Sequence, residues 1–161
     1  MDDFRLKWIN ATRNHNRGIG GCLVGVKKSV VKKFNARLTK FNNIITIYIK
    51  INGRVIIFIP IYLNCNNWML DFNGLGEILE QLKEANAELC LMGDLNARTG
   101  TLQNLDRHIV DSGFVSKTRK SKDTIVNYQG RQLLQLLKDH RLIIVNGRCN
   151  GNSLGEITFR K

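Results

Sequence analysis

Apolar and polar residues are distributed along this chain with periods that predict both strands and helices. β-branched residues dominate residues 43–50 and 54–62, and a glycine-containing apolar run covers residues 19–27. Asn52-Gly53, between the first two runs, is a strong signal for a two-residue hairpin turn. Pro60 should lie near a strand end or at a sheet edge, because proline cannot donate to a strand ladder.

Two segments change to a helical period. Phe72, Leu75, Leu79 and Leu82 recur at spacings of three and four residues, which predicts a helix over about residues 71–87. A second helix is predicted from about Gln129 to Asp139, with leucines on its apolar side. Asn127 is positioned to cap this second helix.

Three further apolar runs predict strands. Residues 88–93 are apolar after Glu88 and follow a helix, so we expect a central strand that is covered on both faces. Residues 141–147 and 156–160 are the other two, and no clear strand precedes residue 19. Hairpins mixed with strand–helix–strand units predict an α/β fold, in a single domain over residues 1–161, with a mixed sheet and helices outside. Both ends of this domain are expected to be truncated.

Charge is the bulk property that narrows the function. The 161 residues include 25 Lys and Arg against 13 Asp and Glu, a net charge of +12. Twelve Lys and Arg but no acidic residue fall between positions 4 and 70. The basic clusters are Lys27, Lys28, Lys32 and Lys33, and then Lys117, Arg119, Lys120 and Lys122. Such a field concentrates polyanions, so we expect DNA as the partner; the alternative is a solvated basic surface.

The sequence disfavours a membrane or disulfide-bonded protein. The longest apolar run, residues 55–63, is nine residues with one proline, which is too short to span a bilayer. The first residues lack a signal-peptide core, and no basic amphipathic helix suggests a membrane surface. The four cysteines show no CxxC or zinc-finger spacing and are expected to be reduced and mostly buried thiols. We therefore expect a nuclear or cytoplasmic protein with no membrane and no small-molecule cofactor.

The segment LMGDLNARTG carries the candidate chemistry. Asp94 and Asn96 follow an apolar strand and, two residues apart on an extended chain, should point the same way at its C-terminal end. The carboxylate can polarise a water or bind Mg²⁺, the amide can donate to a phosphate oxygen, and Arg98 adds donors for a phosphate. One alternative is a turn in which Asp and Asn bond their own backbone. A calcium loop is excluded, because the sixth position is not glycine and the twelfth is not glutamate.

With its neighbouring segments, GDLNA resembles the motif of the endonuclease/exonuclease/phosphatase superfamily. RGIGGCLVGVKKS and IPIYLNCNNWMLDF are similar to further segments of that family. KDTIVNYQGRQLLQLLKDHRLIIVNGR followed by GEITF resembles the endonuclease domains of non-LTR (LINE-type) retrotransposons in particular. The resemblance covers nearly the whole chain. It implies part of a four-layer α/β sandwich of the deoxyribonuclease-like type.

The resemblance also implies roles for individual residues. Asp94 would activate or orient the attacking water and bind the metal, Asn96 would contact the scissile phosphate, and the Tyr62 hydroxyl would lean on that phosphate. The residues expected to contact DNA are Arg98, Arg131 and Thr158. For the arginines a solvated surface is the alternative, and for Tyr62 and Thr158 an ordinary strand position. The implied cofactor is Mg²⁺, with Mn²⁺ as a substitute, and the implied partners are DNA and the rest of a retrotransposon polyprotein.

Two family elements have no counterpart in this sequence. They are the metal-binding glutamate of the first strands, with its asparagine, and the closing Ser-Asp-His motif. Asp139-His140 and Asp106-Arg107-His108 do not stand where that motif belongs. We therefore expect metal-dependent DNA nicking that is weak or absent in this chain alone. The alternatives are a non-catalytic, basic nucleic-acid-binding remnant of such a domain and a relative that hydrolyses phospholipids or inositol phosphates.

Overall fold

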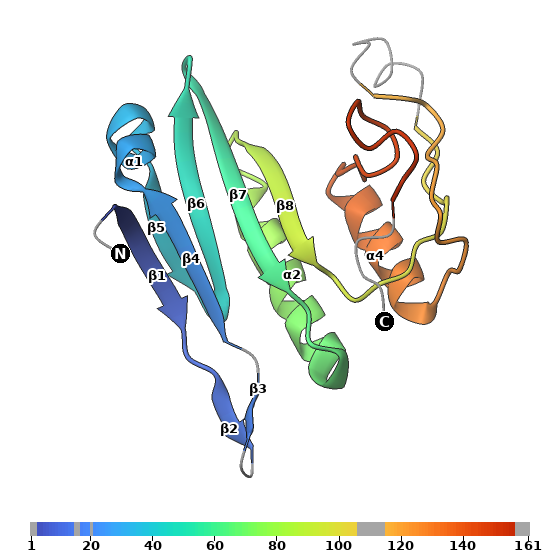
Figure 1. The fold of residues 1–161 in the computed structure, drawn as a ribbon, viewed down its shortest axis with the longest axis horizontal. Helices are drawn as coiled ribbons and strands as arrows, with labels where there is room; N and C mark the ends of the chain where they lie inside the picture. The colour runs from blue at the N-terminus through green and yellow to red at the C-terminus, as the bar shows by residue number, and fades with distance from the viewer. Residues whose placement is uncertain (1–2, 15–16, 20, 106–114, 157–161) are drawn as a thin grey trace. The chain divides into compact units, whose positions relative to one another are not determined.

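The computed structural model describes residues 3–14, 17–19, 21–105 and 115–156. The predicted α/β class is confirmed, because helices combine with antiparallel and mixed sheets (Figure 1). The chain divides into two compact units, Met1–Asn96 and Ala97–Lys161, each described separately below. No helix in the described ranges is both long and apolar enough to cross a membrane.

A four-stranded sheet forms the main part of the first unit. Its strands, in spatial order, are β5 (Arg37–Phe41), β6 (Ile44–Ile51), β7 (Arg54–Tyr62) and β8 (Glu88–Asp94). Neighbouring strands are antiparallel except β7 and β8, which are parallel. The predicted hairpin is confirmed: Asn52 and Gly53 have φ of 50° and 81°, the positive values that its two-residue turn requires.

A helix connects the two parallel strands. After the 3-10 turn η1 (Cys65–Asn67), α2 spans Trp68–Leu82. The predicted helix is confirmed, although it begins at Trp68 rather than 71 and ends at Leu82 rather than 87. Its buried residues follow the apolar stripe: Trp68, Phe72, Leu75, Ile78, Leu79 and Leu82. This stripe and the fully buried Ile57 and Ile59 of β7 belong to the core of the first unit.

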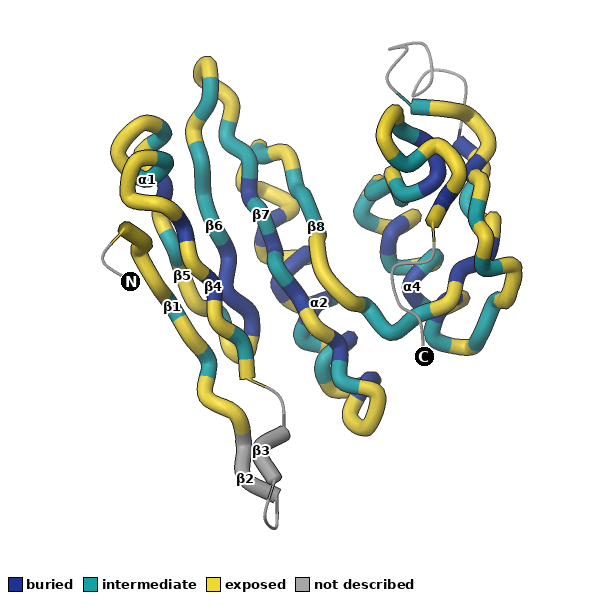
Figure 2. Tube along the Cα trace, in the orientation of Figure 1, coloured by how far each residue is buried: buried dark blue, intermediate teal, exposed yellow. Residues whose placement is uncertain are grey.

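β8 differs from its prediction. It is the outermost strand of the sheet in the described part of the chain, and its residues are half-buried or exposed (Figure 2). The expectation of a central strand covered on both faces was therefore wrong. The physical reason is that apolar composition reports a strand's preference for burial, whereas its position depends on which segments pair with it.

Two antiparallel ribbons precede this sheet. One joins β1 (Phe4–Ile9) to β4 (Cys22–Lys27), and the other joins β2 (Thr12–Asn14) to β3 (Arg17–Ile19). The short helix α1 (Lys28–Phe34) follows β4. The expectation that no clear strand precedes residue 19 was wrong, since β1 pairs with β4 along its whole length. The alternation of apolar and basic residues from Phe4 to Trp8 was the signal for it.

Pro60 lies close to the end of β7, as predicted. The β6–β7 ladder ends at the pair Ile47 and Phe58, so Pro60 lies beyond it and pairs with Met92 of β8 in the described ladders. A missing backbone N–H is tolerated there, because the β6–β7 ladder does not extend to the proline.

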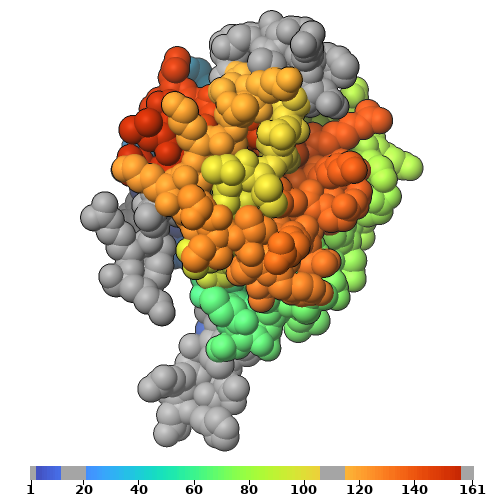
Figure 3. All heavy atoms as spheres, turned by 90° about the vertical axis from the view of Figure 1, so that its right-hand side faces the viewer, coloured from blue at the N-terminus to red at the C-terminus, as the bar shows by residue number. Residues whose placement is uncertain are grey.

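The second unit is built around α4 (Tyr128–Asp139), and Figure 3 shows one of its faces. The predicted helix and its cap are confirmed, because the Asn127 side chain accepts a hydrogen bond from Gly130 N at 2.8 Å. The strand predicted over residues 141–147 is wrong, since this segment contains no strand. Two of its backbone groups bond to one side chain instead: Gln103 Nε2 donates to Leu142 O, and Gln103 Oε1 accepts from Ile144 N. All but the first residue of the strand predicted over residues 156–160 lie outside the described residues.

Candidate functional site

The carboxyl ends of β7 and β8 bring two candidate residues together. Tyr62 and Asp94 are the last residues of these strands and are partners in the parallel register. Backbones of neighbouring strands lie about 4.8 Å apart, and register partners project to the same face of a sheet. The phenol of Tyr62 and the carboxylate of Asp94 therefore leave adjacent backbone positions on one side of the sheet. We call this pair of strand ends the Tyr62–Asp94 edge.

The edge lies on the open face of the two strands. Ile57 and Ile59 project to the opposite face and are completely buried. Tyr62 is 51% exposed and Asp94 is also exposed. Both polar groups are accessible to a ligand that approaches from solvent.

Hydrogen bonds to main-chain carbonyls hold the segments that follow the two strands. The N–H of Leu63 donates to the carbonyl of Asp94 at 3.0 Å, which extends the ladder by one bond beyond β7. The indole Nε1 of Trp68 donates to the carbonyl of Leu95 at 2.8 Å. Trp68 is buried and stacks on Phe72 with 4.5 Å between ring centroids. A rigid aromatic anchor thus fixes the chain immediately after Asp94. This role of Trp68 was not predictable from the sequence, since an apolar residue before a helical stripe indicates only packing.

Asn96 takes a different conformation from the one expected. Its φ of 46° is left-handed, so Asp94 and Asn96 do not lie two apart on an extended strand. Asn96 N donates to Asp94 Oδ1 at 2.9 Å, the turn considered as the alternative. The Asn96 side-chain Nδ2 donates to the carbonyl of Leu63 at 2.7 Å. Asn96 therefore lies beside the edge, but it ties the backbones of the two strand ends together and holds the carboxylate through its own N–H.

The structure explains why position 93 is a glycine, which the sequence did not reveal. Its φ is 132°, and a Cβ at this position would lie 2.0 Å from the carbonyl oxygen of Ile61 on β7. The neighbouring strand therefore leaves no room for any side chain at this position.

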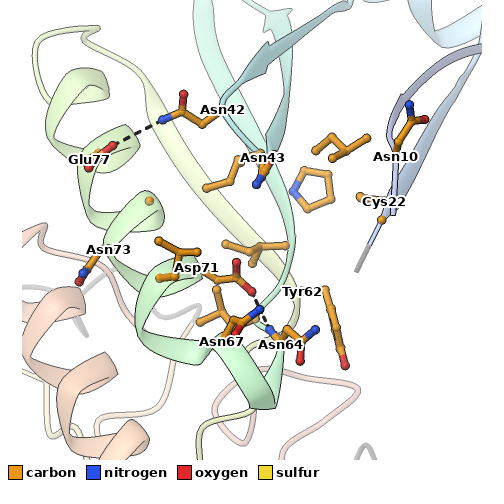
Figure 4. Close-up of a pocket in the computed structure, with 18 residues that line it drawn as sticks. Asn10, Cys22, Asn42, Asn43, Tyr62, Asn64, Asn67, Asp71, Asn73 and Glu77 are labelled. Carbon is orange, nitrogen blue, oxygen red and sulfur yellow. Dashed lines mark hydrogen bonds between the residues drawn. The ribbon is translucent and has the colours of Figure 1, made fainter. Parts of the chain in front are cut away.

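A cavity of 570 Å³ adjoins Tyr62 (Figure 4). Asp71 Oδ2 accepts a hydrogen bond from Asn64 N at 2.9 Å at this cavity. Partial burial raises the pKa of the Cys22 thiol in its wall, which disfavours a reactive thiolate there. The expectation of mostly buried cysteines was wrong, since Cys65 is exposed and the other three are half-buried. Six asparagines contribute to the lining: Asn10, Asn42, Asn43, Asn64, Asn67 and Asn73. Neither Asp94 nor Asn96 belongs to the lining, so the cavity and the edge share Tyr62 alone among the candidate residues.

The candidate DNA contacts fall in the second unit. Arg98 is half exposed and binds Asp123 with two hydrogen bonds, from Nε at 2.9 Å and from the terminal Nη2 at 2.7 Å. The hydrogen bond from Arg98 lowers the pKa of the Asp123 carboxyl, with help from Ile125 N–H. Arg131 is exposed on the first turn of α4. Thr158 lies outside the described residues.

The two basic clusters differ in how far their side chains are exposed and paired. Lys27, Lys28, Lys32 and Lys33 are all exposed at the end of β4 and on α1. In the second cluster Arg119 is buried, where it donates to Thr99 Oγ1 at 2.8 Å and to Gly100 O. Lys122 forms an ion pair with Glu156. The first cluster is therefore the stronger candidate surface for a polyanion.

A metal at the edge would depend on its substrate. Within the described ranges, no three His, Cys, Asp or Glu side chains gather closely enough to hold an ion. Asp94 keeps one carboxylate oxygen, Oδ2, without a partner in the described structure. Mg²⁺ commonly keeps several waters and combines one or two carboxylates with substrate phosphate oxygens. Among the described residues, Asp94 fits that pattern as a single protein ligand, which would need phosphate oxygens and waters to complete the coordination.

Neither a scan against protein-family models nor a search of curated proteins finds a match for this chain.

Proposed function

We propose that this chain is a phosphodiesterase that nicks DNA, with the Tyr62–Asp94 edge facing the scissile phosphate. The observation that carries the proposal is the register of β7 and β8, which sets a phenol and a carboxylate side by side at the carboxyl ends of parallel strands. Ligands of open α/β sheets bind at such ends. The architecture we propose is part of the four-layer α/β sandwich of the deoxyribonuclease-like type.

The two side chains support different parts of phosphodiester hydrolysis. The free oxygen of Asp94 can accept a proton from an attacking water, and Asn96 N–H on the other oxygen fixes the orientation of the carboxylate. The Tyr62 hydroxyl can donate to a non-bridging phosphate oxygen, where negative charge develops. When bound, Mg²⁺ would neutralise phosphate charge. Because Asp94 is the one protein ligand identified for it, we expect a slow reaction.

DNA is the substrate that the charge distribution favours. The exposed lysines of β4 and α1 lie in the long segment without acidic residues, so they can contact phosphates without competition from nearby carboxylates in the sequence. Arg131 is free to contact a backbone phosphate from its exposed position on α4. Arg98 keeps two of its N–H donors on Asp123, which leaves its other donors for that role. We extend the proposal to association with a retrotransposon polyprotein, as the motifs imply.

A second candidate function is DNA binding without hydrolysis. The net charge of +12 and the exposed lysine cluster favour it, because neither depends on Asp94. Such binding would weaken steeply with salt, through the release of counterions from DNA.

Plasmid nicking separates the two candidates. Purified chain is incubated with supercoiled plasmid and Mg²⁺ or Mn²⁺, with EDTA as the control. We expect slow, metal-dependent nicking that falls to background in Asp94→Ala and about tenfold or more in Tyr62→Phe, since one hydrogen bond to a charged group is lost. Tyr128→Phe is the matched control, because Tyr128 is 57% exposed on α4 and should leave the rate unchanged.

Salt-dependent DNA affinity is measured on the same variants. Nicking that survives Asp94→Ala, or that no metal supports, contradicts the catalytic proposal. Unaltered, salt-sensitive binding by Asp94→Ala without nicking in the wild type would favour the binding function.

A further inference from the structure

The ribbon formed by β1 and β4 presents an apolar face to solvent. Phe4, Leu6 and Trp8 alternate with two basic residues, so they project to one side of β1. The register places Leu23 opposite Trp8 and Lys27 opposite Phe4 on that side. Trp8 is 62% and Leu23 is 64% exposed, and Phe4 and Leu6 are exposed as well. We call this surface, Phe4, Leu6, Trp8, Leu23, Gly25 and Lys27, the ribbon face.

The opposite side of the ribbon already has a packing role. Val24 and Val26 of β4 project to that side and are buried in the first unit. Gly25 lies between them in sequence and projects to the ribbon face, where a Cβ would lie 3.1 Å from Leu6 Cδ2 and 3.5 Å from Phe4. The side chains of β1 therefore lie across Gly25 and form a continuous apolar surface. Four clustered large apolar side chains on one face are typical of an interaction site.

We propose that the ribbon face binds an amphipathic helix that has an apolar stripe and an acidic end. Two strands about 4.8 Å apart offer a strip close to the 10–12 Å width of a helix with its side chains. β1 has six residues, a length of about 20 Å, which a helix of about 13 residues matches. The shape of the ribbon face thus fits a single helix laid along it.

The lysines beside the ribbon face determine which end of the bound helix should be acidic. Lys27 stands at the Phe4 end of the ribbon face, and Lys28, Lys32 and Lys33 of α1 follow it directly. No acidic residue lies between positions 4 and 70 to neutralise them. A helix with glutamates or aspartates at the end beside Lys27 would be stabilised there, and one with lysines would be repelled.

Two other occupants fit the ribbon face less well. A single-stranded nucleic acid needs several cations along its backbone, whereas this face carries one lysine among four large apolar residues. A second copy of the chain would bring together two molecules that each carry a net charge of +12.

The test uses a synthetic helical peptide of 14 residues with blocked termini. Leucines at helical spacing form its stripe, and glutamates occupy one end; a second peptide has lysines in place of those glutamates. Binding of labelled peptide to the full chain is followed by fluorescence anisotropy. We expect the acidic peptide to bind and Leu23→Glu to weaken its binding by about tenfold or more. The reason is that the peptide would cover position 23, so the complex would bury a charge in place of an apolar side chain.

Two further variants test specificity. Lys27→Glu should weaken the acidic peptide and strengthen the lysine peptide, which a purely apolar contact would not do. Leu154→Glu is the matched control in the second unit, where the leucine is 56% exposed and its change should leave binding unaltered. Circular dichroism verifies that each variant folds.

Three outcomes would overturn the proposal. If wild type and Lys27→Glu each bind both peptides equally well, the partner does not need an acidic end and the proposal is contradicted. If Leu23→Glu weakens the binding of single-stranded DNA as strongly as that of the acidic peptide, the ribbon face is assigned to nucleic acid. A dimer in analytical ultracentrifugation that Leu23→Glu dissociates would assign it to self-association.

Discussion

Tyr62 and Asp94 end two parallel strands at the same register position. The helix α2 separates them in the sequence, and it returns the chain to the same end of the sheet from which β8 must start. The parallel pairing therefore places both C-terminal strand ends at one edge, where a phenol and a carboxylate face the same side. This relationship supplies the geometry of the proposed site.

The pairing of β7 and β8 near the Tyr62–Asp94 edge should require glycine at position 93. We expect Gly93→Ala to destabilise the chain by about 2 kcal/mol or more, because the new Cβ would collide with Ile61 O and the positive φ is unfavourable for alanine. Urea unfolding followed by circular dichroism measures the change.

Gly74→Ala serves as the matched control for that substitution. Gly74 lies within α2, and a Cβ there would meet nothing within 4 Å. This variant should be more stable by about 0.5–1 kcal/mol, since alanine favours a helix. Changes of the same sign and size in both variants would contradict the close contact at Gly93.

The second unit should lose stability in acid through Asp123. The pKa of Asp123 is lowered by Arg98, below its ordinary value of 3.8, so the folded state binds the proton more weakly than the unfolded state. The stabilisation is complete above the ordinary pKa and is lost as the pH falls through the lower, folded value. We expect Asp123→Asn to be less stable than wild type at pH 7, with a difference that shrinks as the pH falls below 3.8.

The same experiment on Arg98→Gln checks the cause. If the ion pair is responsible, the Arg98→Gln and Asp123→Asn variants lose the same pH-dependent part, and the double variant loses little more. Urea midpoints between pH 2 and pH 7 provide the comparison. An undiminished difference between Asp123→Asn and wild type at the lowest pH would contradict this explanation.

Arg148 should stabilise the loops of the second unit. The side chain is buried and donates to the carbonyls of Ile144, Ser116, Lys117 and Gln103. Arg148→Met keeps much of the apolar stem but leaves these carbonyls without their donor. We expect a loss of about 2–4 kcal/mol in thermal or urea unfolding, because four part-buried hydrogen bonds of a buried side chain are lost together.

The control for this prediction is Arg131→Met, the same chemical change at an exposed position on α4. It should alter stability by about 0.5 kcal/mol or less. Equal effects of the two substitutions would mean that the buried hydrogen bonds of Arg148 contribute nothing specific.

The candidate site was predictable in part. The residue types after an apolar strand pointed to Asp94, and the motif resemblance pointed to Tyr62 on a different strand. The conformation of Asn96 was not predictable from spacing, because the chain leaves the strand at Asp94 and turns left-handed. The partner that occupies Arg98 was also hidden, since Asp123 is distant in sequence and the pair forms only after the loops of the second unit fold.

Local chemistry determined the elements that the sequence predicted well. Asn52-Gly53 specifies its hairpin through backbone conformation, the apolar stripe specifies α2, and Asn127 specifies the start of α4 through one side-chain acceptor. Each of these signals acts over a few residues. The tertiary structure alone decided that β8 lies outermost among the described strands, that residues 141–147 form no strand, and that Tyr62 stands beside Asp94. Strand order and register depend on hydrogen bonds between segments far apart in the chain, and no local pattern determines which segment supplies them.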